Sequence, residues 1–260
     1  LLYEVSVTPK PGLVDRHNSG SHTDMDFFSF LDSAAALTPH LREMFRTGWD
    51  LARENIARLF GALRLVGLQA EDAMLRATGG VNTHRGIIFS LAVLGGAYGR
   101  ASALSGGDGP SLADVLSFCR ALGSCALAEL PSLPVSTNGE RCYRAYGSDG
   151  VRGEAARGFP SVTALGLPSL RRALADGRSI NDAAALALLA LIGGVEDTNM
   201  IHRGGYEAAR ARREEARALS AAGAPIDTLD DLDRQYIAEN LSPGGCADLL
   251  ALSLLMHFLD

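Results

Sequence analysis

Lysine is almost absent from this chain of 260 residues: only Lys10 is a lysine among the 24 basic side chains, and the rest are arginines. The 30 Asp and Glu residues outnumber the basic ones, which gives a formal net charge of −6. A protein that wraps duplex nucleic acid needs a basic field, so the charge balance argues against that class. A local pocket for phosphates stays open, and a lysine that stands alone among arginines is a candidate for a specific role.

Zinc-type cysteine spacing and membrane-length apolar runs are also missing. Cys119, Cys125, Cys142 and Cys246 include no Cys-x-x-Cys pair, which favours reduced thiols of a cytoplasmic protein. The longest strongly apolar stretch, 183–195, is too short to cross a bilayer. We therefore expect no membrane association. Because the chain begins Leu-Leu without a methionine, we expect its true start to be missing, and a lost targeting segment stays open.

Period-two alternation does not occur convincingly anywhere, so strands are expected to be few or absent. Apolar residues recur instead at helical spacing, in segments 27–34, 59–66, 112–122, 186–192 and 247–259. This pattern predicts an all-α protein. We expect a single domain over 1–260, with glycine-rich loops lining one central pocket, and a long irregular segment at 131–168.

The first polar cluster surrounds Lys10. Its two flanking prolines hold the backbone extended and exclude a helix there. Asp15 and Asp24 follow, the second just before an expected helix at Met25, so a helix cap is the favoured role of Asp24 when it is taken alone. Hard oxygens near an ammonium also suit a magnesium–phosphate site.

A second cluster is the loop 78–86, which carries Gly79, Gly80, Asn82, His84 and Arg85 and runs into an apolar helix. Free backbone N–H groups at such a helix start attract an anion, although an ordinary helix cap explains the same pattern. A third cluster, 196–205, directly follows the most apolar helix of the chain. It contains Glu196, Asp197, Asn199, His202 and Arg203. Buried helices carry such groups only when these are paired or face a cavity, which favours a functional role.

Two further loops have weaker signals. In segment 146–160, Arg152 stands beside Gly153 and Glu154, where a phosphate contact and a flexible surface loop are equally good interpretations. In segment 240–248, Gly244 and Gly245 precede the last helix, which fits either an anion-binding nest or a capped helix start.

Taken together these segments resemble one known family. The strings are Thr-Pro-Lys-Pro-Gly-Leu-Val-Asp at 8–15, Gly-Ser-His-Thr-Asp-Met-Asp at 20–26, Thr-Gly-Gly-Val-Asn-Thr-His-Arg-Gly at 78–86, Arg-Gly-Glu-Ala at 152–155, Glu-Asp-Thr-Asn at 196–199 and Leu-Ser-Pro-Gly-Gly at 241–245. In this order they resemble the triphosphoribosyl-dephospho-CoA synthase family over nearly the whole chain, and 17–28 is more similar to its citrate lyase branch than to its malonate decarboxylase branch. Cys246 departs from the small residue expected there.

The resemblance implies a pentosyltransferase that uses ATP and 3′-dephospho-CoA. The 2′-hydroxyl of dephospho-CoA would attack C1 of the ATP ribose, and adenine would leave. The product would pass to a transferase that loads an acyl carrier protein. Mg²⁺ is the expected cofactor because it accompanies the triphosphate. A homodimer stays open.

The residue types suit this chemistry, because glycosidic cleavage passes through an oxocarbenium-like state that a carboxylate stabilises. We expect Glu196 or Glu154 to act at the ribose and His84 or His202 to move a proton. The expected magnesium ligands are Asp15, Asp24 and Asp197. The expected substrate-binding residues are Lys10, Gly79, Gly80, Asn82, Arg85, Arg152, Asn199, Arg203, Gly244 and Gly245. A Lys10→Ala variant is expected to lose triphosphate affinity and to keep its fold.

Two other functions use the same residues. A helical, magnesium-dependent nucleotide or ADP-ribosyl glycohydrolase would transfer the ribosyl group to water. A non-catalytic helical adaptor would use the glycine loops to bind a partner, but it would have no need for the ionisable groups at 196–203.

Overall fold

The computed structural model describes residues 1–106 and 109–259, and this part of the chain contains helices and no strand. The all-α prediction is therefore confirmed. The chain divides into two compact units that are described separately. Unit 1 comprises Leu1–Leu31, Ser136–Gly150 and Pro160–Asp260; unit 2 comprises Asp32–Val135 and Val151–Phe159. The prediction of a single domain over 1–260 stays a prediction.

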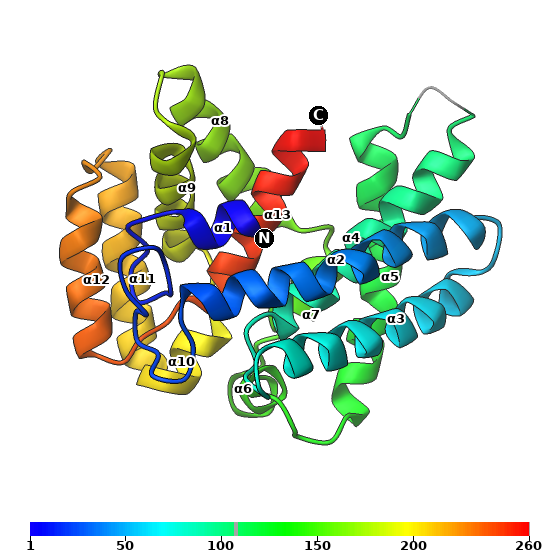
Figure 1. Ribbon diagram of the computed structural model, residues 1–260, viewed down its shortest axis with the longest axis horizontal. Helices are drawn as coiled ribbons and strands as arrows, with labels where there is room; N and C mark the ends of the chain where they lie inside the picture. The colour runs from blue at the N-terminus through cyan, green and yellow to red at the C-terminus, as the bar shows by residue number, and fades with distance from the viewer. Residues whose placement is uncertain (107–108, 260) are drawn as a thin grey trace. The chain divides into compact units, whose positions relative to one another are not determined.

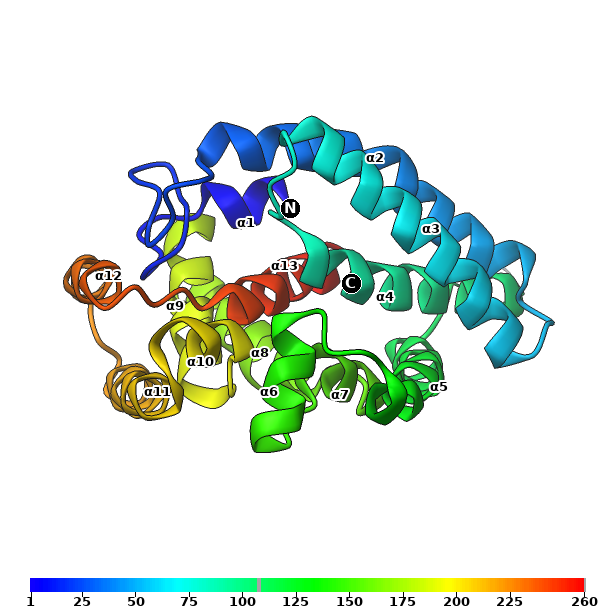
Figure 2. The ribbon, with the colours of Figure 1, turned by 90° about the horizontal axis from the view of Figure 1, so that it is seen from below.

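Unit 1 is built around two helices that are apolar on most faces, α9 (Ile180–Gly194) and α13 (Gly244–Leu259). Helices of this kind are stable only when they are buried, and other helices cover them. α11 (Tyr206–Ala221) and α8 (Leu167–Ala175) pack against α9, and α1 (Leu2–Ser6) lies beside α13 (Figure 1). α10 (Thr198–Gly204) lies next to α11 (Figure 2). The remaining elements are α6 (Asn138–Tyr146), α12 (Thr228–Ala238) and a π-helical turn, η2 (Val162–Gly166).

Unit 2 consists of most of α2 (Phe27–Asp50) and of α7 (Gly150–Ala156), with α3 (Ile56–Ala77), α4 (Arg85–Leu104), α5 (Leu112–Glu129) and the short 3₁₀ turn η1 (Leu130–Ser132). Glycines let α2 and α4 approach closely: a Cβ on Gly99 would lie 2.1 Å from the Phe45 carbonyl oxygen. α4 is long and apolar enough to span a membrane, but 61% of its most apolar window is buried in the unit, as in the core helix of a globular domain.

Segment 131–168 differs from the irregular region that its composition predicts. It contains η1, α6, α7 and η2 and leads into α8. α6 begins at a capping box between Thr137 and Glu140 and ends at Gly147 in the left-handed conformation. These helices are too short to show a sustained apolar period, so only their caps mark them in the sequence.

Asp24 does not cap a helix, which corrects that expectation. α2 begins at Phe27, and the Asp26 carboxylate accepts a hydrogen bond of 2.8 Å from the backbone N–H of Ser29. This is the usual geometry of an N-cap, two residues further along the chain than the sequence indicates.

Candidate functional site

The loop between α1 and α2 in unit 1 is organised around the carboxylate of Asp15. One oxygen accepts hydrogen bonds from Thr8 Oγ1 at 2.6 Å and the Lys10 backbone N–H at 3.2 Å. The other accepts from the backbone N–H groups of His17 and Asn18, at 2.7 and 3.1 Å. Both oxygens are therefore saturated, and Asp15 is 2% exposed.

Neighbouring helices hold this loop in place. Asp233 of α12 accepts a hydrogen bond of 2.9 Å from the Gly12 N–H and one of 2.8 Å from the Asn18 amide. Burial raises the pKa of Asp233. Gly12 has φ +68°, and a Cβ there would lie 2.9 Å from Tyr236 Cβ of α12 and 2.2 Å from the carbonyl oxygen of Leu241, which follows that helix. The tight turn therefore requires glycine at position 12.

Lys10 lies inside unit 1 rather than at its surface. Its ammonium is 2.5 Å from Glu4 Oε1, and the two side chains are 2% and 6% exposed. Glu4 comes from α1, so this buried ion pair fastens the loop to that helix. The described conformation does not offer the ammonium to a ligand in solvent.

Asp197 joins the starts of two helices. One carboxylate oxygen accepts from the backbone N–H groups of Asn199 and Met200, at 2.8 and 3.2 Å, and caps α10. The other accepts from the Cys246 N–H at 2.8 Å, in the first turn of α13. Burial raises the pKa of Asp197, and these three hydrogen bonds oppose the rise.

The glycine pair at the start of α13 makes this junction possible. A Cβ on Gly245 would lie 3.0 Å from Asp197 Oδ2, and one on Gly244 would lie 2.9 Å from the Asn199 amide nitrogen. The structure thus brings segments 196–199 and 244–245 into contact, a pairing that the sequence did not indicate.

A third carboxylate, Asp248 of α13, belongs to the same neighbourhood. Burial raises its pKa well above the usual range, and the negative charges of Glu4 and Asp197 raise it further. Such a carboxylate is costly to keep charged, which is typical of functional positions.

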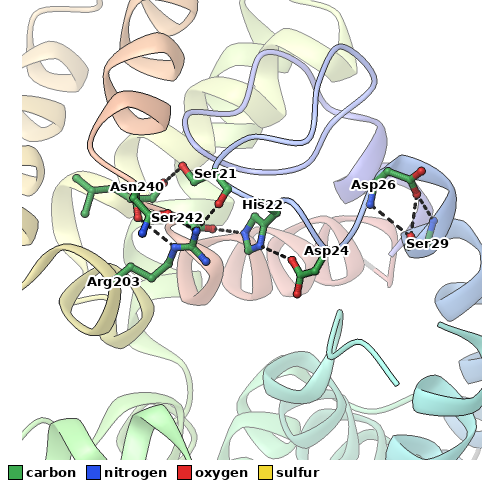
Figure 3. Close-up of polar contacts among 9 residues, drawn as sticks. Ser21, His22, Asp24, Asp26, Ser29, Arg203, Asn240 and Ser242 are labelled. Carbon is green, nitrogen blue, oxygen red and sulfur yellow. Dashed lines mark hydrogen bonds and ion pairs between the residues drawn. The ribbon is translucent and has the colours of Figure 1, made fainter. Parts of the chain in front are cut away.

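Arg203, at the C-terminal end of α10, ties three segments together (Figure 3). Its guanidinium donates to the carbonyl oxygen of Ser21 and to the side chain and carbonyl oxygen of Asn240. Ser21 Oγ donates to the Leu241 carbonyl oxygen at 2.6 Å. Arg203 thus holds the N-terminal loop against segment 240–242.

His22 lies in the same group of contacts, between a serine and a carboxylate (Figure 3). Its Nε2 is 2.9 Å from Ser242 Oγ, and its Nδ1 is 3.8 Å from Asp24 Oδ1. Burial, followed by the positive charge of Arg203, lowers the pKa of His22. The imidazole is therefore mostly neutral at neutral pH. Asp24 itself is exposed.

The other predicted residues of unit 1 lie around α10. Glu196, just before this helix, is partly exposed and has Arg213 Nη1 3.7 Å from its Oε2. Asn199 is partly buried, and His202 is exposed to solvent.

Unit 2 holds the cluster of the second loop. His84 is 4% exposed, and its Nδ1 lies 2.6 Å from Ser33 Oγ of α2. Asn82 accepts a hydrogen bond of 3.0 Å from the Arg85 N–H, and the Arg85 guanidinium pairs with Glu71 of α3. Asn82 thus provides a hydrogen-bond acceptor for the N–H of Arg85, the first residue of α4.

Gly79 and Gly80 have φ of +64° and +94° and end α3, where the Gly80 N–H donates to the Leu75 carbonyl oxygen at 2.7 Å. A Cβ on either would meet no atom within 4 Å, so these positions open to space. Arg152 and Glu154 lie on α7 rather than in a loop; Arg152 donates to the Ala126 carbonyl oxygen at 3.2 Å.

The structure therefore sorts the predicted residues by unit. Unit 1 contains Lys10, Asp15, Asp24, Glu196, Asp197, Asn199, His202, Arg203, Gly244 and Gly245, and unit 2 contains Gly79, Gly80, Asn82, His84, Arg85, Arg152 and Glu154. Among residues 1–106 and 109–259, no group of three or more His, Cys, Asp or Glu side chains is arranged to hold a metal ion.

Sequence reasoning did not assign Glu4, His22, Ser242 or Asp248 to the site. His22 and Ser242 lie inside the recognised strings, so their positions were available as a signal. For Glu4 the sequence indicates no functional role. It shows only an acidic residue in an apolar segment, six residues before the only lysine.

Comparisons with known proteins agree over the full chain. A family model, CitG, described as ATP:dephospho-CoA triphosphoribosyl transferase, matches residues 1–260. Relatives named 2-(5″-triphosphoribosyl)-3′-dephosphocoenzyme-A synthase include one from Streptococcus mutans, 39% identical over 100% of this chain and 93% of the relative. Another, from Vibrio cholerae, is 39% identical over 99% of this chain and 84% of the relative. A third, from Streptococcus equi, is 41% identical over 100% and 94%.

A solved structure has the same fold. The crystal structure of a triphosphoribosyl-dephospho-CoA synthase from Archaeoglobus fulgidus superposes with a TM-score of 0.59. The superposition covers 90% of this chain and 98% of that one, at 20% sequence identity.

Proposed function

The chain belongs to the CitG family of ATP:dephospho-CoA triphosphoribosyl transferases, and on that premise we propose that the junction of α10 and α13 is part of its active site. The full-length match to the family carries the function. The junction supports the location, because two helix starts and the partly exposed carboxylate of Glu196 occur together there.

The reaction transfers the 5-triphosphoribosyl group of ATP to the 2′-hydroxyl of 3′-dephospho-CoA. The hydroxyl oxygen forms a bond to C1 of the ribose while the bond from C1 to adenine breaks. The electron pair of that bond leaves with adenine, which takes up a proton, and the hydroxyl loses one. The triphosphate is kept, so the protein has to position it rather than cleave it.

Glu196 is the carboxylate that we propose to stabilise the positive charge at C1. About a third of its side chain is exposed, so it reaches solvent at the start of α10. Glu154 of unit 2 stays a second candidate for this role. A carboxylate near the anomeric carbon is what an oxocarbenium-like transition state requires.

Phosphate binding is proposed for each unit separately. Gly244 and Gly245 supply N–H groups in the first turn of α13, and Asn199 and Arg203 lie on α10. In unit 2 the proposed donors are Gly79, Gly80, Asn82, Arg85 and Arg152. Because Lys10 is buried against Glu4, we propose that it acts by fixing the loop rather than by touching a phosphate oxygen.

Magnesium is proposed to arrive with the triphosphate. Asp15 does not fit a metal ligand, because its two oxygens already accept four hydrogen bonds. Asp197 is buried and accepts hydrogen bonds from three backbone N–H groups and from the Cys246 thiol, whereas Asp24 is exposed. Asp24 therefore fits the usual magnesium arrangement of one or two carboxylates plus phosphate and water oxygens better than Asp197, which stays a proposed ligand.

The proton of the attacking hydroxyl is proposed to pass to a histidine. His84 is buried against Ser33, and His202 is exposed at the end of α10. We further propose a cytoplasmic location, delivery of the product to a transferase that modifies an acyl carrier protein, and a homodimer as the assembly to test.

A single incubation tests this function. The protein is mixed with ATP, magnesium and 3′-dephospho-CoA, and the products are identified by mass spectrometry. We expect free adenine and an enlarged coenzyme in equal amounts, and no adenine when dephospho-CoA is omitted. Adenine release from ATP alone would instead identify a glycohydrolase, and unchanged ATP would contradict both.

A further inference from the structure

Helix α11 carries four arginines, and one of them differs from the rest. Three donate hydrogen bonds within the protein: Arg210 to Glu207 at 2.9 Å, Arg212 to Glu215 at 2.5 Å and Arg217 to the Gly193 carbonyl oxygen at 2.9 Å. Within the described residues, Arg213 makes no hydrogen bond, and its buried Nε has no partner. Its one ion-pair contact, to Glu196, is 3.7 Å long.

Arg213 lines a hollow, and two residues of the proposed active site, Glu196 and Asp197, line it too. The hollow is lined by Glu196, Asp197, Tyr206, Arg210 and Arg213 together with Val195 and apolar residues of α10 and α11. Its volume is about 10 Å³, enough for one water-sized group. One oxygen atom of a larger anion fits such a space while the rest of the anion stays outside.

We propose that Arg213 binds a phosphate oxygen of one of the two substrates. Nη1 faces Glu196, which leaves the edge formed by Nε and Nη2 without a partner. That edge matches two oxygens of a phosphate group, and guanidinium–phosphate pairs of this geometry are among the stronger hydrogen bonds in proteins.

A role in binding phosphate explains why Arg213 has a buried N–H without a partner. A buried N–H without a partner costs free energy, and an arginine used only for structure would be expected to have its donors satisfied, as on the rest of α11. Arg210, one turn earlier on the same helix, also lines the hollow but is already paired with Glu207 and Glu214. The carboxylates of Glu196 and Asp197 favour an anion that brings a cation with it, which suits a phosphate chain.

This inference rests on the proposed function, and its test separates the two sources of phosphate. The Arg213→Gln variant is compared with wild type for the KM of ATP, the KM of dephospho-CoA and inhibition by inorganic tripolyphosphate. Arg234→Gln is the control, because Arg234 is an exposed arginine of the same unit that pairs with Asp231. Product mass analysis on wild type first establishes that the transfer occurs.

For Arg213→Gln we expect one KM to rise by roughly tenfold to a hundredfold, with kcat changed much less. A higher KM for ATP with weaker inhibition by tripolyphosphate identifies the triphosphate of ATP as the group that Arg213 binds. A higher KM for dephospho-CoA alone identifies the diphosphate of dephospho-CoA. Arg213→Lys keeps the charge but loses the planar edge, so a smaller rise is expected. Arg234→Gln is expected to match wild type.

Two results would overturn the proposal while wild type remains active. One is unchanged KM values and tripolyphosphate inhibition in Arg213→Gln. The other is a loss of kcat alone, which would mean that Arg213 acts only through Glu196. If Arg213→Gln does not fold by circular dichroism, Arg213→Lys decides alone, and KM values equal to those of wild type would overturn it.

Discussion

Lys10 shows how a single partner changes the interpretation of a residue. In the sequence it is the only lysine, between two prolines, and it is expected to contact phosphate. In the structure its charge is buried and neutralised by Glu4 at 2.5 Å. Removing one member of a buried ion pair leaves the other charge without compensation, which is much more costly than losing an exposed pair.

We therefore predict that Lys10→Ala destabilises the protein by about 3–5 kcal/mol, measured by urea unfolding. This differs from the expectation, based on the sequence alone, that the fold would be kept. The double variant Glu4→Gln/Lys10→Met removes both charges and is predicted to recover most of that loss.

The exposed pair of Arg58 and Glu54 provides the control. Arg58→Ala is expected to cost less than about 1 kcal/mol. A Lys10→Ala variant as stable as Arg58→Ala would show that the buried pair does not hold the loop.

At the junction of α10 and α13, one buried carboxylate connects two helices. Each helix start needs acceptors for its first N–H groups, and one carboxylate, Asp197, serves both. The sequence indicates Asp197 as a magnesium ligand and not as the cap of α10 that the structure shows. It does not indicate that the second acceptor oxygen serves a helix that begins 47 residues later, at Gly244.

Asp197→Asn is predicted to lower stability by about 1–3 kcal/mol and to abolish adenine release. The amide keeps one acceptor for α10 but turns an N–H₂ group toward the Cys246 N–H, which loses its partner. Thermal unfolding and the adenine assay measure the two effects. An active variant would remove Asp197 from the site.

Gly245→Ala tests the same junction from the other side, because its Cβ would lie 3.0 Å from Asp197 Oδ2. Gly61→Ala is the control: it lies inside α3 with no atom within 4 Å of the added carbon, and it should stabilise the protein by about 0.5–1 kcal/mol. Equal effects of the two substitutions would contradict a tight junction.

At the scale of the whole molecule, the fold was predictable because helical periodicity depends on neighbours within a few residues. The recognised strings also supplied the family. The two compact units were not predictable from composition, because the chain passes between them several times and no linker separates them. The contacts of Asp15, Lys10 and Asp248 were missed for a related reason: which donor or charge meets each carboxylate depends on packing that no local pattern records.

Magnesium is expected to bind the protein together with the nucleotide and not by itself. Without nucleotide, we expect no magnesium binding tighter than the millimolar range, because the described residues contain no ready-made metal cluster and Asp15 is saturated. Isothermal titration with MgCl₂ alone should show no site, whereas titration with ATP and magnesium should. Adenine release should stop with excess EDTA and return with added magnesium. A micromolar magnesium site in the nucleotide-free protein would mean that the aspartates rearrange into a cage that the hydrogen bonds of Asp15 and Asp197 now prevent.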